Sequence, residues 1–236
     1  MSRKISVSQP AALILSIVNR QWMLDRVARS RYSPDACALV AALLLAGPAG
    51  AQAPRALFDG RTLAGWEVTN FGASGEVAVR DSAIVLGMGD PMTGITWKGS
   101  FPKVDYELSL DAKRVAGSDF FAAITFPVGD APSTLVVGGW GGGVVGLSSI
   151  DGSDASENET RRFKQFVDDR WYRIRLRVTG EKIQAWIDDE MMVDFAYPGR
   201  HLSIRVEVMA SQPFGIATWR TTGALRNIEL RELSPP

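Results

Sequence analysis

Apolar and polar residues alternate along much of the chain from Arg55 onward. In VDYELSLDA, residues 104–112, the residues Val104, Tyr106, Leu108 and Leu110 fall on one face and mostly charged residues on the other. The segment WYRIRLRV, residues 171–178, repeats this arrangement with its arginines on the polar face. A period of two residues predicts β-strands with one face in the core and the other in water.

Turn signals separate these strands and predict an all-β fold. KIQAWIDDEMMVDF, residues 182–195, is expected to form a hairpin that turns at 188–190, and VAVRDSAIVL, residues 77–86, another that turns near Asp81. Further strands are expected at 94–98, 118–126, 133–138, 203–209, 214–220 and 224–232. Roughly a dozen short strands predict a two-sheet antiparallel sandwich of the jelly-roll type.

One segment favours a short helix. In SENETRRFKQF, residues 156–166, Ser156 precedes Glu159 by three positions, the spacing of a capping box. Phe163 and Phe166 then share one face of a helix. We therefore expect one short helix in the sandwich.

The segment GGWGGGVVGLSSIDG, residues 138–152, is rich in glycine. Gly141, Gly143 and Gly146 match the dinucleotide-binding spacing G-x-G-x-x-G, which must follow a strand and open a helix. Here LSSIDG follows, which indicates strand and turn and argues against a dinucleotide site. Trp140 has small neighbours, so we expect an exposed ring on which a sugar stacks; the alternative is a core tryptophan.

The N-terminal region is expected to be a signal peptide. An apolar run and a series of small residues, 37–53, follow Arg26, Arg29 and Arg31. The apolar core, 36–46, is shorter than the roughly 20 residues that cross a bilayer.

We therefore predict a signal peptide region over residues 1–53, with cleavage after Ala51 or Ala53, and a single jelly-roll domain over 54–236. Met23 is an alternative start, and a second anchor around AALILSIV, residues 11–18, is the competing interpretation. The protein is expected to be exported to the periplasm or the extracellular space.

Charge and cysteine content exclude several partners for this exported chain. Without residues 1–53 it holds 20 lysines and arginines against 24 aspartates and glutamates, a net charge of −4. No basic patch indicates nucleic acid, and no membrane contact is expected after signal cleavage. Cys37, the only cysteine, lies in the signal region, so neither disulfides nor a thiol nucleophile are expected. The oligomeric state does not follow from the sequence.

Three segments carry a resemblance to a known family: LFDGRTLAGWEV at 57–68, WYRIRLRVTGEKIQAWIDDEMMVD at 171–194 and ALRNIELREL at 224–233. Together they resemble the 3-keto-disaccharide hydrolase-like domain family, over nearly all of residues 56–233. The resemblance implies a concanavalin A-like sandwich related to family 16 glycoside hydrolases. It also implies a concave sheet that handles carbohydrate and, for some members, cleavage of glycosides that carry a 3-keto group.

The chain departs from the family 16 enzymes in its carboxylates. It has no E-x-D-x-x-E strand, the source of the acid and nucleophile that retaining enzymes hold about 5 to 5.5 Å apart. Direct retaining hydrolysis is therefore not expected. A 3-keto group acidifies the neighbouring C–H, so one general base and one positive group suffice to start elimination of the aglycone, after which water adds.

Arg205, Glu207 and Asp119 are the candidate catalytic residues. Arg205 and Glu207 share one face of the strand expected in SIRVEVMA, residues 203–210. They would form either a solvated ion pair or the cation and base of the elimination. Asp119, just before FFAAITF, is a third candidate.

Trp140, Trp219, Asp151 and Asp154 are the candidate substrate-binding residues. The two aspartates lie in the loop DGSDASENE, residues 151–159, which could hold sugar hydroxyls or a divalent cation but does not match the EF-hand spacing. No other cofactor is expected, and the metal ligands are unknown. Four further tryptophans are expected to serve packing: Trp66, Trp97, Trp171 and Trp186.

The sequence leaves two functions open. One is a glycoside hydrolase that acts on 3-keto-glycosides by base-initiated elimination and hydration. The other is a noncatalytic lectin-like module that only binds saccharides. Both take a saccharide or glycoside as their ligand.

Overall fold

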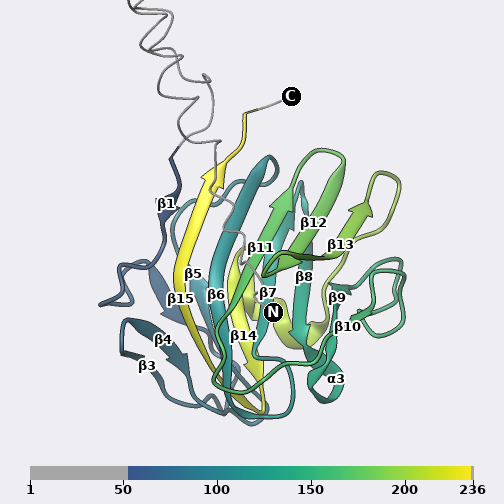
Figure 1. Ribbon diagram of the computed structural model, residues 1–236. Coiled ribbons are helices and arrows are strands. Elements are labelled where there is room, and N and C mark those ends of the chain that lie inside the picture. Colours follow the sequence, from purple (N-terminus) through teal and green to yellow (C-terminus); the bar gives the residue numbers. More distant parts are fainter. Residues whose placement is uncertain (1–52, 235–236) are drawn as a thin grey trace, which may run out of the picture. The chain divides into compact units, whose positions relative to one another are not determined.

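The structure, a computed structural model, describes residues 53–234, and these residues fold mainly as β-strands (Figure 1). In chain order the strands and short helical turns are β1 Arg55–Ala56, β2 Trp66–Val68, β3 Val77–Arg80, β4 Ala83–Leu86, β5 Met92–Trp97, β6 Tyr106–Gly117, β7 Ala122–Val128, β8 Ala131–Gly138, α3 Gly139–Gly142, β9 Val144–Ser148, β10 Arg162–Phe163, β11 Tyr172–Val178, β12 Lys182–Ile187, β13 Glu190–Ala196, η1 Val206–Ser211, β14 Gly215–Trp219 and β15 Thr221–Glu232.

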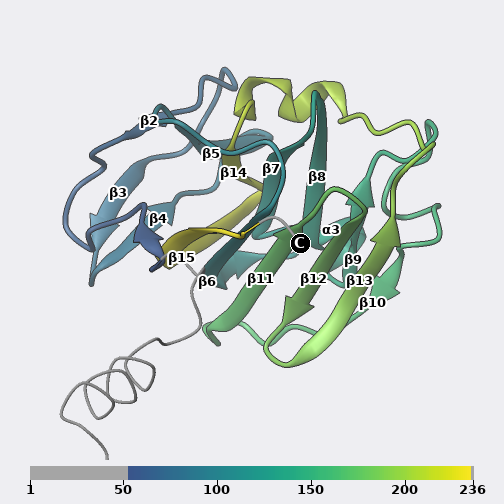
Figure 2. The same cartoon turned by 90° about the horizontal axis from the view of Figure 1, so that it is seen from above.

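Residues 53–234 form two antiparallel sheets. One has eight strands in the order β13-β12-β11-β6-β15-β4-β3, with β1 added beside β15. The other has seven strands in the order β10-β9-β8-β7-β14-β5-β2. Figure 2 shows them as two layers, with β11, β12 and β13 in one layer and β7 and β8 in the other. The predicted two-sheet antiparallel sandwich is confirmed.

The core lies between the sheets and is built from alternate residues of each strand. Tyr106, Leu108 and Leu110 of β6 are at most 1% exposed, as the period of two predicts. From the other sheet, Ile124 and Phe126 of β7 point into the same core and are fully buried. Each buried side chain of this size contributes about 1.5 to 3 kcal/mol relative to exposure, so the apolar positions dominate the stability of the sandwich.

Both predicted hairpins are confirmed. Strands β3 and β4 pair through a turn at Asp81 and Ser82, whose φ angles are 50° and 57°. Positive φ at both turn positions is the geometry of a type I′ turn, which matches the twist of the flanking strands. Strands β12 and β13 pair through the two-residue turn at Asp188 and Asp189, where Asp188 has a φ of 55°.

The helix predicted at 156–166 is wrong. The Ser156 hydroxyl donates to Asp154 Oδ1 at 2.7 Å, so it does not cap a helix. The buried Asn158 side chain donates to the Leu147 carbonyl at 2.8 Å, and Glu159 pairs with Arg200. Such local bonds to side chains compete with helix formation. The segment folds as turns and then forms strand β10, which pairs with β9.

The strand predicted at 203–209 is also wrong. Ser203 pairs with Ser149 through two backbone hydrogen bonds, and the chain then enters the 3₁₀ helix η1. Val208 is buried against Met92 and Ala217, which lie on the outer face of the seven-stranded sheet, whereas Val206 is 75% exposed. Figure 2 shows this yellow-green turn on the side of the sheet that faces away from β11 and β12. Segment 203–211 therefore covers part of that outer face.

The glycine-rich stretch forms a tight turn between β8 and β9. Gly138, Trp140, Gly141 and Gly142 all have positive φ, so α3 is a left-handed turn and not a regular helix. Gly146 lies inside β9, so the G-x-G-x-x-G spacing opens a strand and not a helix, which again argues against a dinucleotide site.

The predicted signal region lies outside the described residues, apart from Ala53. Within residues 53–234, none of the helical segments has the length and apolar character needed to span a bilayer.

Candidate functional site

A pocket of about 240 Å³ opens on the outer face of the seven-stranded sheet. Strands β7, β8, β9 and β14 form its floor, and segment 205–208 and the α3 turn form its sides. Its lining residues are Asp119, Phe120, Ala123, Thr134, Val136, Trp140, Ser148, Arg205, Glu207, Val208 and Trp219. This volume lies just below the roughly 300 Å³ lower end for drug-sized ligands, so the pocket suits a small ligand such as one or two rings.

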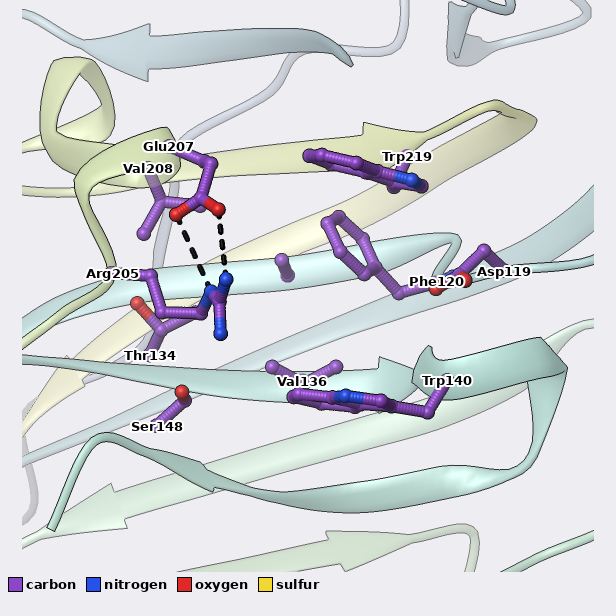
Figure 3. A pocket seen from close by; sticks show the side chains of 11 residues that line it. Asp119, Phe120, Thr134, Val136, Trp140, Ser148, Arg205, Glu207, Val208 and Trp219 are labelled. Atoms are coloured by element: carbon purple, nitrogen blue, oxygen red, sulfur yellow. Dashed lines mark hydrogen bonds and ion pairs between the residues drawn. The ribbon is translucent and has the colours of Figure 1, made fainter. Parts of the chain in front are cut away.

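The pocket has a polar end and an aromatic end (Figure 3). Arg205, Glu207, Thr134 and Ser148 lie together at one end of the view. At the other end the indole rings of Trp140 and Trp219 lie on opposite sides, with the ring of Phe120 between them in the view and Asp119 nearby. A ligand bound across the pocket therefore meets charged and hydroxyl groups at one side and ring faces at the other.

Arg205 organises the polar end. Its Nη2 donates to Glu207 Oε1 at 2.8 Å and its Nε to Glu207 Oε2 at 3.3 Å, a bidentate pair. Its Nη1 donates to Asp154 Oδ2 at 2.7 Å. Bidentate arginine–carboxylate pairs fix geometry more firmly than single ion pairs, so Glu207 is held in one orientation toward the pocket.

The ion pair also sets the charge state of Glu207. The hydrogen bonds from Arg205 lower the pKa of the Glu207 carboxyl below its ordinary value, although partial burial opposes the shift. Hydrogen bonds to Glu207 likewise raise the pKa of Arg205. Glu207 is therefore a carboxylate at neutral pH, able to accept a proton or a hydroxyl hydrogen bond.

Asp119 sits at the aromatic end and supports the backbone there. Its Oδ1 accepts a hydrogen bond from the Phe120 N–H at 2.8 Å, and its Oδ2 one from the Gly141 N–H at 3.4 Å. Phe120 comes just before β7, and Gly141 follows Trp140 in the α3 turn. The Asp119 carboxylate therefore connects the start of β7 to the α3 turn.

Trp140 and Trp219 present their rings in different ways. Trp140 is 41% exposed and stands at the tip of the α3 turn with φ 48°. The glycines beside it carry no side chain that could cover the ring, as predicted. Trp219, at the end of β14, is half-buried and packs against Phe120 with the ring centroids 6.1 Å apart.

The structure brings five of the predicted site residues into one pocket: Asp119, Trp140, Arg205, Glu207 and Trp219. Asp154 reaches the site only through its ion pair with Arg205. Asp151 is not brought to the pocket, because its carboxylate accepts bonds from Arg200 Nε at 2.6 Å and the His201 N–H at 2.8 Å. These bonds, the His201 one first, lower the pKa of Asp151.

The loop aspartates do not assemble a metal site. Across residues 53–234, no group of three His, Cys, Asp or Glu side chains is close enough to hold a metal ion. Asp151 and Asp154 instead pair with separate arginines, Arg200 and Arg205. The divalent cation considered from the loop composition gains no support from this geometry.

Sequence reasoning missed Phe120, Thr134 and Ser148. Thr134 and Ser148 are neighbours across β8 and β9, and each is at most 2% exposed. Both side chains lie on the outer face of their strands, opposite the core residues Leu135 and Leu147. Polar residues at the non-core positions of β8 and β9 were the available signal, but nothing in the sequence says which outer face is covered.

The tryptophans expected to serve packing divide into two groups. Trp66 is buried and meets Trp97 at 5.2 Å between ring centroids, as predicted. Trp171 and Trp186 do not pack in the core. They lie half-buried on the eight-stranded sheet, covered by the guanidinium groups of Arg226 and Arg175 at 4.1 Å each. Their rings are occupied by cation–π contacts on the other sheet from the pocket.

The comparisons with known proteins agree with this architecture. The family model described as a 3-keto-alpha-glucoside-1,2-lyase-like domain matches residues 53–231. No curated protein matches the chain. Among solved structures, a protein of unknown function with a galectin-like fold from Bacillus subtilis is 9% identical, with a TM-score of 0.55 over 79% of this chain and 98% of that chain.

Two other solved structures are similar at this level. The Crh5 transglycosylase in complex with NAG is 14% identical, with a TM-score of 0.52 over 79% of this chain and 86% of that chain. A carbohydrate esterase from the Shiga toxin-encoding bacteriophage phi24B is 13% identical, with a TM-score of 0.51 over 77% of this chain and 100% of that chain. TM-scores above 0.5 at such low sequence identities show a shared fold and nothing more.

Proposed function

Because the chain belongs to the 3-keto-alpha-glucoside-1,2-lyase-like domain family, a family of carbohydrate-active domains, we propose that it is an exported enzyme that cleaves 3-keto-glycosides in this pocket. The observation that supports this most is the position of the Arg205–Glu207 pair. It places a carboxylate and a cation at one end of a pocket whose other end is walled by tryptophan rings. Those are the three features that the elimination of a 3-keto-glycoside requires.

The reaction divides into two steps that need no covalent intermediate. A base removes the proton from C2, next to the ketone at C3, and the electron pair of that C–H bond forms an enolate. The enolate then expels the aglycone oxygen from C1, which takes up a proton and leaves as an alcohol. Water adds across the resulting C1–C2 double bond, so glycoside and water give the free 3-keto sugar and the alcohol.

Each residue at the polar end has a role in this scheme. Glu207 takes the C2 proton, because it is ionised at neutral pH and lines the pocket. Arg205 stabilises the enolate oxygen, since a guanidinium placed where negative charge develops lowers the barrier. Thr134 and Ser148, nearly fully buried in the pocket floor, offer hydroxyls to the sugar.

One feature favours a noncatalytic lectin-like module as the second candidate. Glu207 already accepts two hydrogen bonds from Arg205, and Asp119 already accepts two from backbone N–H groups. A carboxylate whose pKa is lowered is a weaker base. If these bonds persist when ligand binds, the pocket holds a saccharide without reacting with it.

The two candidates separate in one experiment. The protein without residues 1–53 is incubated with a 3-keto-glucoside and with the plain glucoside, aglycone release is followed by chromatography, and binding is measured by calorimetry. We expect release from the 3-keto substrate alone, because the ketone is what acidifies the C2 proton. Glu207→Gln should abolish release while the ligand still binds, since the amide keeps a hydrogen-bonding oxygen but cannot take a proton.

A matched control is Glu157→Gln, an exposed glutamate outside the pocket lining, which should leave release unchanged. Binding of both sugars with no release from either would support the lectin-like module. Neither binding nor release would exclude both candidates.

A further inference from the structure

We propose that the substrate is a glycoside with a flat aromatic aglycone, with the sugar bound at the polar end of the pocket and the aromatic group held between Trp140 and Trp219. This inference rests on the proposed function and names the substrate class of the same site. It follows from the uneven distribution of rings and hydrogen-bonding groups in the pocket.

Three aromatic rings line the aromatic end of the pocket. Trp140 and Trp219 lie on opposite sides of the pocket, and the Phe120 ring stands between them in the view at 47° to that of Trp219 (Figure 3). Aromatic groups prefer offset stacking or edge-to-face contact with centroids 4.5 to 7 Å apart. A flat guest between the tryptophans can stack on an indole and meet another ring at an angle.

The hydrogen-bonding groups favour the sugar at the other end. A pyranose carries hydroxyls around its rim, and a buried hydroxyl without a partner costs about 1 to 3 kcal/mol. Among the described pocket residues, the polar end offers Arg205, Glu207, Thr134 and Ser148. At the aromatic end the carboxylate is Asp119, whose two oxygens already accept backbone N–H groups, and the indole Nε1–H groups of Trp140 and Trp219 are donors alone. An aromatic ring needs no such partners.

Both ends of the pocket reach solvent, since Arg205 at the polar end has 47% of its side chain exposed. Thr134 and Ser148 are at most 2% exposed, so they form the floor of the polar end. Trp140 is 41% exposed at the tip of its turn, so the aromatic end opens toward solvent. In the proposed orientation the sugar lies beside Glu207, and the aglycone extends past the tryptophans, where substituents on the aromatic group have room.

The test compares two 3-keto-glucosides whose aglycones have the same leaving oxygen and similar size, benzyl and cyclohexylmethyl. Both alcohols leave from a CH₂–O group, so only the flatness of the six-membered ring differs. We expect the benzyl compound to bind about fivefold more tightly by calorimetry and to show a correspondingly lower KM, because a ring-to-ring contact of about 1 kcal/mol corresponds to that ratio.

Variants assign the preference to the two tryptophans. Trp219→Leu and Trp140→Ala should bring the benzyl-to-cyclohexylmethyl ratio close to one. The control Trp171→Ala, on the eight-stranded sheet, should keep the wild-type ratio.

Each outcome separates this inference from the proposed function. If both compounds are cleaved with equal affinity, the preference for an aromatic aglycone is wrong and the proposed enzymatic function is upheld. If the tryptophan variants weaken both compounds equally, the rings stack on the sugar and the proposed orientation is wrong. If neither compound is cleaved, the proposed function is wrong, and the ratio of the two binding constants alone tests this inference. Tighter binding of the benzyl compound supports an aromatic group between the tryptophans, and equal binding contradicts it.

Discussion

Glu207 and Asp119 differ in what holds them, and that difference decides which one can act as a base. The partner of Glu207 is the side chain of Arg205, which stands on an extended residue and has 47% of its surface exposed. The partners of Asp119 are backbone N–H groups of the pocket wall, which cannot move away without moving the wall. A ligand oxygen can compete for Arg205 and free Glu207, whereas Asp119 remains a structural acceptor.

The Arg205 pair predicts a measurable titration. Because Arg205 lowers the Glu207 pKa, the carboxyl should titrate below 4.5 in the folded protein, and Arg205→Ala should move it up toward that ordinary value. A lowered pKa means that the pair stabilises the fold above pH 4.5 and that this stabilisation is lost as the pH falls through the folded pKa. An NMR titration of the glutamate side chains measures both values.

The control for this titration is Arg61→Ala, which removes an exposed arginine outside the pocket lining and should leave Glu207 unchanged. A Glu207 pKa that does not respond to Arg205→Ala would show that the two side chains are not paired in solution.

Trp140 gives the second prediction at this scale. Trp140→Ala should weaken binding of a 3-keto-glycoside with an aromatic aglycone by about 1 to 3 kcal/mol, with little change in Tm, because the ring is exposed and contacts ligand more than protein. The buried Trp66 provides the contrast, since Trp66→Ala should cost about 3 to 5 kcal/mol of unfolding free energy. Calorimetry and thermal melts of both variants check the pair. A Trp140→Ala protein that melts early but binds normally when folded would make this residue a packing residue.

Some site residues could be predicted from the sequence and others could not. Trp140 stood out because glycines surround it, and Arg205 and Glu207 because a cation and a carboxylate lie two residues apart. Thr134 and Ser148 are small polar residues in otherwise apolar strands, a pattern that occurs on any half-covered sheet. Their role depends on segment 203–211 folding over their strands, which is a long-range contact that local patterns do not encode.

At the scale of elements, the α3 turn is what presents Trp140. The turn needs positive φ at several consecutive residues, which explains the density of glycine in 138–143. Arg114 holds its far side, donating to the Gly142 carbonyl at 3.5 Å and the Phe166 carbonyl at 3.1 Å. Arg114 of β6 therefore connects the turn that carries Trp140 to the segment at Phe166.

Gly142→Ala tests whether the conformation of the α3 turn is needed for stability and for binding. At Gly142 φ is 101°, and a Cβ there would lie 2.8 Å from Arg114 Nη1 and 3.0 Å from the Ser118 carbonyl oxygen. We expect a loss of about 1 to 3 kcal/mol in unfolding free energy and weaker saccharide binding, because the backbone conformation is strained and the turn must shift. Denaturant unfolding and calorimetry measure the two effects.

Gly180→Ala is the matched control, since a Cβ there meets nothing within 4 Å. Equal stability of the two variants would show that the conformation of the turn at 138–143 is not needed for stability.

The elements also show where sequence patterns mislead. The hairpins were predictable because turn type and strand alternation are both local. Segment 156–166 carries a capping-box pattern, yet Asn158 prefers buried hydrogen bonds to the Leu147 and Ser153 carbonyls. The alternation in 203–210 resembles a strand, but the segment joins neither sheet of residues 53–234 and closes into η1 instead.

At the scale of the whole molecule, the outer faces of the two sheets differ in how far they are covered. The eight-stranded sheet exposes charged residues at alternate positions, such as Arg173 and Asp194, which made its strands easy to predict. The seven-stranded sheet is buried on both sides along β7, all of whose residues are buried, because segment 203–211 lies over its outer face. The fold class therefore followed from the sequence, whereas the location of the site on one outer face required the three-dimensional arrangement.

Export is the prediction that concerns the chain as a whole. The apolar run before residue 53 and the arginines upstream of it lead us to propose that the mature protein lies in the periplasm or outside the cell. N-terminal sequencing of the protein recovered from those fractions should begin at Gln52 or Pro54. A chain that keeps the residues before Ala51 and stays with the cells would contradict export by signal cleavage.

The central claim is that saccharide binds on the outer face of the seven-stranded sheet, between the Arg205–Glu207 pair and the tryptophans. The most direct measurement is a titration with a 3-keto-glucoside, followed by NMR of the tryptophan indole N–H groups and assigned by single substitutions. The signals of Trp140 and Trp219 should shift with saturation, because their rings line the pocket, while those of Trp171 and Trp186 stay in place on the opposite sheet. Saturable shifts of Trp171 and Trp186, with Trp140 and Trp219 unchanged, would place the saccharide on the other face and contradict the claim.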